Sequence, residues 1–307
     1  MPDLVTPMAA FALGAALARA NSCTVASARR LVFHGRPDWL LGLWIAIGWA
    51  GLTMTVFALA LPQAVLLPAQ LHVGWQVILG AVIMGLGATL NQGCFLGSVA
   101  GLGRGDLAFL FTLIGIALAL ALTNGSLQSA PLGAMEGNAS SLRSSNTLFV
   151  GALLFAPLAM FGFWRWWRLR QMPVLALILV GVAGGTVYAC NPDWSYTSGL
   201  ARVVASGFRA DTVFVEGAAI AVVAGVVTSA VVGGSFRLRL PGFRSAAIHL
   251  AGGALMATGA LFVPGGNDTL MLWAIPGLTL YGLIAYVVMV GTIITLLAAH
   301  RHLSTGR

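Results

Sequence analysis

Two of the three cysteines in this sequence stand in short polar segments that interrupt long apolar runs. Cys23 follows Ala20-Asn21-Ser22, and Cys94 follows Asn91-Gln92-Gly93. We expect each of these cysteines to stand at the start of a short helix. A cysteine in that position faces unpaired backbone N–H groups and the positive end of the helix dipole. Such surroundings attract anions and favour the thiolate over the thiol. The pattern predicts a site for an anion whose own sulfur contacts a cysteine sulfur.

Other residues at such interruptions complete the candidate site. Arg19 lies inside the first apolar stretch, where an ionisable side chain needs a partner and is a functional candidate. We expect the following residues to contact the substrate: Arg19, Asn21, Cys23, Asn91, Gln92, Gly93, Cys94, Cys190, Gly266 and Asn267. Three arginines are expected at the mouths of a pathway: Arg29, Arg104 and Arg202.

Each candidate also has an ordinary structural explanation. A free cysteine behaves as a small apolar residue, so both thiols could be core side chains. Arg19 could form a structural pair with Asp106, Glu216 or a helix C-terminus. Arg29 is explained almost equally well by an excess of positive charge on the cytoplasmic side. Two cysteines that both fall at an interruption nevertheless favour the functional interpretation.

The composition places these residues in a membrane protein. Of the 307 residues 59% are hydrophobic and only 8% charged, and the mean hydropathy is +0.93, whereas soluble domains carry about 25% charged residues. The formal charge of +8 comes from arginine alone, because the chain has no lysine. In a membrane protein an excess of positive charge is typical of the loops on the cytoplasmic side. It therefore does not indicate binding to nucleic acid, and no nucleic-acid partner is expected. Without lysine there is no Walker-type loop, which excludes ATP-driven transport by this chain alone.

Catalytic cofactors and metals are not expected either. The three cysteines show no C-x-x-C spacing, and the five histidines form no ligand cluster with them. The N-terminus lacks a basic region before its apolar stretch, so we expect no cleaved signal peptide. The chain is therefore predicted to be a non-enzymatic membrane protein whose first segment spans the bilayer.

Nine transmembrane crossings are expected, all helical. Five uninterrupted apolar runs lie near 39–61, 106–124, 147–164, 211–233 and 277–299. Four interrupted stretches lie at 4–33, 74–102, 172–205 and 246–275. They are typical of broken helices, which occur at membrane depth where protein or a water-filled cavity satisfies the freed backbone groups. With most arginines on one side, we predict an outside N-terminus and a cytoplasmic C-terminus.

A self-comparison predicts an internal repeat. At an offset of 173, Ser22, Thr24, Ala28 and Arg29 align with Ser195, Thr197, Ala201 and Arg202. At an offset of 172, Gly80, Met84, Gly87 and Ala88 align with Gly252, Met256, Gly259 and Ala260. Four crossings, a linking helix at 147–164 and four more crossings would form one transmembrane domain of two inverted repeats, about 1–135 and 172–307. Glycine-rich faces such as 80–87 and 181–185 predict close helix packing.

The cysteine motifs resemble a known family. The segment Asn91-Gln92-Gly93-Cys94-Phe95-Leu96-Gly97, with Gly103-Arg104-Gly105 downstream and Arg19, Cys23 and Arg29 at their spacing, is similar to the YeeE/YedE family of bacterial inner-membrane sulfur transporters. The resemblance implies uptake of thiosulfate through an hourglass-shaped protein, with Cys23 and Cys94 as two relay points for the terminal sulfur. It also implies an anion, the lipid bilayer and a cytoplasmic sulfurtransferase of the TusA type as partners.

One departure from the family leaves the substrate open. A further cysteine in the second half would fall at Gly266, or at Asn267 with a one-residue slip, and neither carries a thiol. Cys190 compensates only if the fold brings it to the pathway. A thiosulfate importer is the favoured interpretation. A transporter of selenium compounds or other anions, and a membrane thiol-exchange protein in which Cys23 and Cys94 lie close together, remain alternatives.

Overall fold

The computed structural model describes residues 2–20, 22–61, 65, 67–123, 145–191, 199, 206, 209, 217–263 and 265–305. In these ranges the regular structure is helical, apart from an isolated bridge between Asp106 and Arg239. Helices are the expected solution for apolar segments in lipid, because a helix satisfies its backbone hydrogen bonds internally.

The helices follow the apolar runs of the sequence. The first half of the chain contains α1 (Pro2–Leu17), α2 (Thr24–His34), α3 (Asp38–Ala60), α4 (Trp75–Leu90), α5 (Phe95–Gly103) and α6 (Ala108–Leu122). The helix α7 (Ser145–Leu169) comes next. The second half contains α8 (Met172–Cys190), α11 (Gly217–Val232), α12 (Phe243–Phe262), α13 (Asn267–Thr269), the π-helical turn η3 (Leu270–Ala274) and α14 (Leu280–Thr305).

Three of the four predicted interruptions are present as breaks between helices. They separate α1 from α2, α4 from α5, and α12 from α13. The fourth follows α8 and lies mostly outside the described residues. Within the described ranges, 6 helical segments are long and apolar enough to cross a membrane, and three shorter apolar helices accompany them. The chain is a multi-pass membrane protein, and the count of nine crossings stays a prediction.

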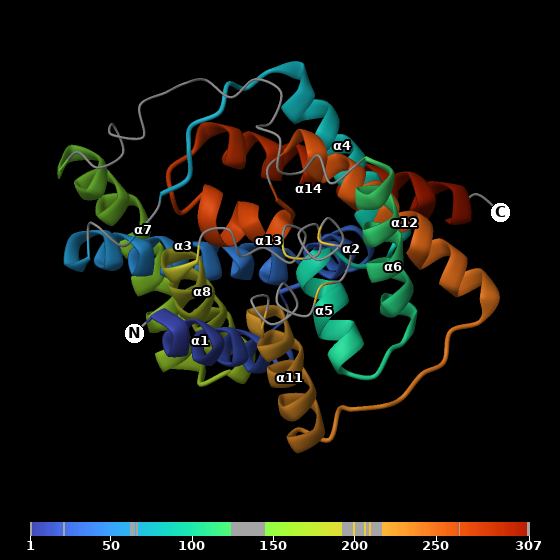
Figure 1. Cartoon of the computed structure of the whole chain (residues 1–307), viewed down its shortest axis with the longest axis horizontal. Helices are drawn as coiled ribbons and strands as arrows, with labels where there is room; N and C mark the ends of the chain where they lie inside the picture. Colours follow the sequence, from blue (N-terminus) through green and yellow to red (C-terminus); the bar gives the residue numbers. More distant parts are fainter. Residues whose placement is uncertain are drawn as a thin grey trace.

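The long helices form two packed groups. In one group α4 packs against α12 and α14, and α12 also packs against α6. In the other, α1 packs against α8 and α11, and α3 packs against α7 and α8. The short helices α2, α5 and α13 lie between these groups, near the centre of the molecule in Figure 1. The breaks in the helices therefore meet in the interior.

Glycines allow the helices of each group to approach closely, as the sequence predicts. A Cβ atom on Gly80 would lie 2.8 Å from the carbonyl oxygen of Gly259, and one on Gly87 would lie 2.8 Å from that of Gly252. Between α8 and α3, a Cβ atom on Gly181 would meet the backbone of Ala46. Small residues at such crossings are how helices gain packing contacts in lipid, where burial of apolar surface gives no net advantage.

Candidate functional site

Three helices begin at the centre of the molecule. Cys23 is the N-cap of α2, Cys94 is the N-cap of α5, and Gly266 is the N-cap of α13. All three N-cap residues have extended backbone conformations, and none of them forms a side-chain capping hydrogen bond. The positive ends of these helix dipoles are thereby gathered in one place. The sequence correctly places both cysteines at helix starts.

The two cysteine sulfurs are in contact. The Sγ atoms of Cys23 and Cys94 lie 3.8 Å apart, although the residues are separated by 71 positions. The backbone N–H of Thr24 donates a hydrogen bond to the Sγ atom of Cys94 at 3.4 Å. Cys94 is buried, whereas Cys23 is half-buried. The accessible sulfur of the pair is therefore that of Cys23, with the Cys94 sulfur directly behind it.

A glycine on α5 makes this contact possible. A Cβ atom at Gly97 would lie 2.5 Å from the Sγ atom of Cys23 and 3.6 Å from that of Cys94. The first distance is well inside van der Waals contact, so α5 approaches the sulfurs only because residue 97 has no side chain.

Asn267, from the second half of the chain, links the starts of α2 and α5. Its Oδ1 atom accepts a hydrogen bond from the backbone N–H of Phe95 at 3.0 Å. Its Nδ2 atom donates to the Oγ1 atom of Thr24 at 3.5 Å. The neighbouring Gly266 packs against the Phe95 ring, because a Cβ atom on Gly266 would lie 2.4 Å from it. The two positions expected to carry the further thiol thus lie beside the cysteine pair.

Asn91 braces the break between α4 and α5. Its Nδ2 atom donates to the carbonyl oxygen of Gly93 at 2.7 Å and to the hydroxyl of Ser98 at 2.8 Å. Its Oδ1 atom accepts a hydrogen bond from the hydroxyl of Thr112 at 2.5 Å. Both amide protons are used inside the protein, so the geometry gives Asn91 a positioning role. Gln92, with a φ of 56°, turns the chain.

A cavity of about 360 Å³ reaches Cys23, whose sulfur contacts that of the buried Cys94. Cys23, Gln92 and Gly93 line it together with Arg104, Arg237, Arg239 and Asp106. We refer to this cavity as the vestibule. Three arginines against one aspartate make its lining cationic, which concentrates anions there. Burial lowers the pKa of the Arg104 guanidinium, yet arginine titrates so far above neutral pH that the group keeps its charge.

A loop from the second half of the chain builds one wall of the vestibule. The backbone N–H of Arg237 donates to the carbonyl oxygen of Arg104 at 2.8 Å, and that of Arg239 donates to Gly105 at 2.8 Å. Gly105 has a φ of 96° and leaves no room for a Cβ atom beside the carbonyl group of Arg237. These contacts bring Arg237 and Arg239 to the vestibule, which the sequence analysis did not foresee.

Other predicted residues lie elsewhere or outside the described residues. The Arg19 side chain donates to the hydroxyl of Ser229 at 3.0 Å and lines a separate apolar groove between α1, α8 and α11. Arg29 is exposed on α2. Cys190 is half-buried at the end of α8 and does not line the vestibule as far as the structure describes it. Asn21 and Arg202 lie outside the described residues.

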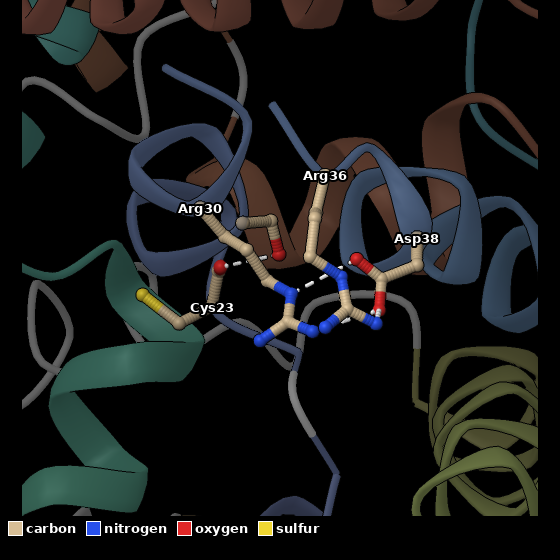
Figure 2. A network of polar contacts seen from close by, with 5 residues as sticks. Cys23, Arg30, Arg36 and Asp38 are labelled. Carbon is tan, nitrogen blue, oxygen red and sulfur yellow. Dashed lines mark hydrogen bonds and ion pairs between the residues drawn. The ribbon is translucent and has the colours of Figure 1, made fainter. Parts of the chain in front are cut away.

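An ion-pair cluster fixes the corner between α2 and α3. The guanidinium of Arg30 contacts the carboxylate of Asp38 at 2.9 Å, and that of Arg36 contacts it at 3.6 Å. Figure 2 shows both arginines converging on Asp38, while the Cys23 sulfur lies over the ribbon of α5. The cluster therefore anchors the far end of α2, whose start carries Cys23.

Tyr286 is a residue near the cysteines that the sequence analysis missed. It lies on α14, which packs against α2, and its hydroxyl lies beside Thr24 within electrostatic reach of Cys23 and Cys94. The signal available in the sequence was one of two phenols, Tyr281 and Tyr286, inside a mostly apolar run. Nothing in its spacing relates it to residue 23 or 94.

Comparison with known proteins identifies one family. The sequence model of the family described as Sulphur transport matches residues 19–177 and 134–295 of the chain. The two matches overlap and together include the cysteines, the vestibule and Asn267. No curated protein matches the chain.

Proposed function

The chain belongs to the Sulphur transport family, which is the YeeE/YedE family, and we propose on this premise that it imports thiosulfate or a related sulfur-containing anion across the bacterial inner membrane. The observation that carries the proposal is the contact between the Cys23 and Cys94 sulfurs at the foot of a cationic vestibule. The membership itself establishes a sulfur-related membrane transporter. The substrate and the role of each cysteine are the proposed part.

The recognition of thiosulfate follows from the chemistry of the site. Thiosulfate and sulfate are both tetrahedral dianions, and arginines or backbone N–H groups attract either of them. A terminal sulfur is present only in thiosulfate. Two thiols in contact accept that large, polarisable atom in place of a hard oxygen. The anion passes from Cys94 to Cys23 by exchange of noncovalent contacts and then enters the vestibule.

We further propose that the fold consists of two inverted repeats of four crossings, about 1–135 and 172–307, joined by a linking helix at 147–164. The sequence offsets relate α1 to α8, α3 to α11, α4 to α12 and α6 to α14. Helix contacts occur in the corresponding pairs, since α1 packs on α11 as α8 packs on α3, and α6 packs on α12 as α14 packs on α4. The paired crossings of Gly80 with Gly259 and Gly87 with Gly252 support the same relation.

The proposed orientation places the vestibule toward the cytoplasm. The loops that carry Arg104 and Arg237 are joined by backbone hydrogen bonds, and Arg301 near the C-terminus donates to the carbonyl group of Val32. Arginine-rich segments expected on the cytoplasmic side therefore contact one another, which supports an outside N-terminus and a cytoplasmic C-terminus. A sulfurtransferase of the TusA type would receive the anion at the vestibule. Reporter fusions at the two ends test the orientation, and reporters on the same side would contradict it.

The deciding experiment is uptake of radiolabelled thiosulfate into proteoliposomes that contain only this chain. Cys94→Ala should abolish uptake with little loss of folded protein. The thiol occupies little volume in the core, and its proposed role is to contact the sulfur of the substrate. Cys23→Ala should reduce uptake. Cys190→Ala is the matched control, since this half-buried cysteine does not line the described vestibule, and it should transport normally. Undiminished uptake by Cys94→Ala would reject the proposed relay.

The sulfur contact also favours a second candidate, a membrane thiol-exchange protein. Two thiols 3.8 Å apart are close enough to exchange sulfur or to form a disulfide with little movement. Such a protein needs a redox partner to turn over, whereas a transporter does not. Uptake by the purified chain in the presence of excess reductant supports the transporter, and its loss under those conditions supports the exchange protein.

A further inference from the structure

Tyr286 is a buried phenol whose hydroxyl has no hydrogen-bond partner among the described residues. The residue is 3% exposed. Burying an unsatisfied hydroxyl costs free energy, and most buried polar groups in folded proteins do have a partner. An exception of this kind calls for an explanation, and a ligand that arrives only during function is one.

The hydroxyl lies near the start of α2 and close to the cysteine pair. It lies beside Thr24, the first residue of α2, within electrostatic reach of both cysteines. The Trp44 ring packs against the Tyr286 ring edge to face at 6.3 Å, which fixes the direction of the phenol. A donor held in a fixed direction beside Thr24, with no partner within hydrogen-bond distance among the described residues, is prepared to bind an acceptor.

The neighbouring amide is already committed. Asn267 uses its oxygen to accept from Phe95 and its nitrogen to donate to Thr24. The further thiol expected in the second half of the chain is also missing at Gly266 and Asn267. Among the described residues of the second half, Tyr286 is therefore the buried side chain near the cysteines whose hydrogen-bond donor is uncommitted.

We propose that Tyr286 is a specificity-determining residue whose hydroxyl donates a hydrogen bond to an oxygen of the sulfur oxyanion while the anion's terminal sulfur contacts Cys23 and Cys94. The proposal rests on the proposed function and assigns the orientation of the substrate. Sulfur is recognised by thiols and oxygen by a phenol, so the anion is held at two points. The hydrogen bond from Tyr286 takes the place of a contact with the missing thiol, and it does not require a second sulfur atom in the ligand.

The test is Tyr286→Phe, which removes one oxygen atom and keeps the ring. Because the lost hydroxyl has no described protein partner, the melting temperature without substrate should stay the same or rise. A hydrogen bond to a charged ligand is strong, so the KM for thiosulfate should rise about tenfold or more. Stabilisation of the protein by thiosulfate should shrink in parallel. Tyr281→Phe, at a buried tyrosine of the same helix, is the control and should leave KM unchanged.

Each other outcome overturns a definite part of the reasoning. An unchanged KM in a folded Tyr286→Phe protein contradicts the inference and leaves the proposed function standing. A melting temperature lowered without substrate shows that the hydroxyl is structural. Fluorotyrosine labelling of the unmutated protein gives a test without substitution, since at least one of its 4 tyrosine ¹⁹F resonances should shift with thiosulfate and not with chloride. No shift in any resonance refutes the inference, and a parent protein that neither binds nor moves thiosulfate refutes the proposed function as well.

Discussion

Replacing Gly97 with alanine should displace the Cys23 sulfur without removing any reactive group. The added Cβ atom would lie 2.5 Å from the Sγ atom of Cys23 and 3.0 Å from its Cβ atom, whereas ordinary contact begins at 3.4 Å. Either the Cys23 side chain or the start of α5 must therefore move by about 1 Å. A displacement of this size at a site that depends on geometry can cost about 100-fold in rate. We expect the initial rate of thiosulfate uptake to fall at least about tenfold.

The effect of Gly97→Ala on stability should be smaller than its effect on transport. Overpacking of a buried site typically costs about 1–3 kcal/mol. Alanine favours the helical conformation of α5 over glycine by about 1 kcal/mol, which offsets part of that cost. The net loss should be about 0–2 kcal/mol, so folded protein can be purified. Thermal denaturation in detergent and uptake into proteoliposomes measure the two effects separately.

Gly291→Ala provides the matched control for this substitution. Gly291 lies in α14, where a Cβ atom would meet nothing within 4 Å. The control has the same gain in helix propensity and no clash, so uptake should be unchanged and stability equal or higher. Normal uptake by Gly97→Ala at normal stability would refute the reasoning. It would mean that the sulfur pair tolerates displacement and is not on the pathway.

Three other changes have expected outcomes. Oxidation with diamide should join Cys23 to Cys94 in a disulfide, because their sulfurs lie 3.8 Å apart. Maleimide labelling of the denatured protein should then detect Cys190 alone. Three labelled thiols would contradict the contact. Asn267→Cys should leave thiosulfate uptake equal or faster but lower stability by about 1–3 kcal/mol, because it removes two buried hydrogen bonds; slower uptake in a protein of normal stability would argue for another substrate. Arg104→Gln should raise the KM for thiosulfate about two- to fivefold at low salt and less at high salt, since its charge acts across the vestibule; an effect independent of salt would indicate a direct contact instead.

The breaks in the helices were predictable because their causes are local. Polar residues and glycines interrupt apolar runs at Asn91-Gln92-Gly93 and before Asn267, and the helices end within a few residues of those positions. The placement of Cys23 and Cys94 as N-cap residues followed from the same pattern. Helix starts depend on the few residues around them, which a sequence displays directly.

The role of Asn91 was less accessible from the sequence. Its position at a break made it a candidate for substrate contact, but its amide is occupied by Gly93, Ser98 and Thr112. Arg19 was a candidate because an ionisable side chain inside an apolar stretch needs a partner, and the fold places it in a groove beside Ser229, 210 residues away. Whether a polar side chain serves the ligand or the protein depends on which partners the packing supplies.

The sequence by itself determined that this chain is a helical membrane protein with interrupted helices and with cysteines at two helix starts. Only the tertiary structure decided that the two sulfurs touch, that Asn267 joins the starts of α2 and α5, and that Tyr286 lies beside them. The physical reason is that long helices such as α3, α4, α6 and α8 are apolar on every face, so the hydrophobic pattern that identifies the buried side of a soluble helix is absent from them. In lipid the partners are chosen by close packing at glycines and by a few buried hydrogen bonds between distant residues, and neither can be inferred from local sequence.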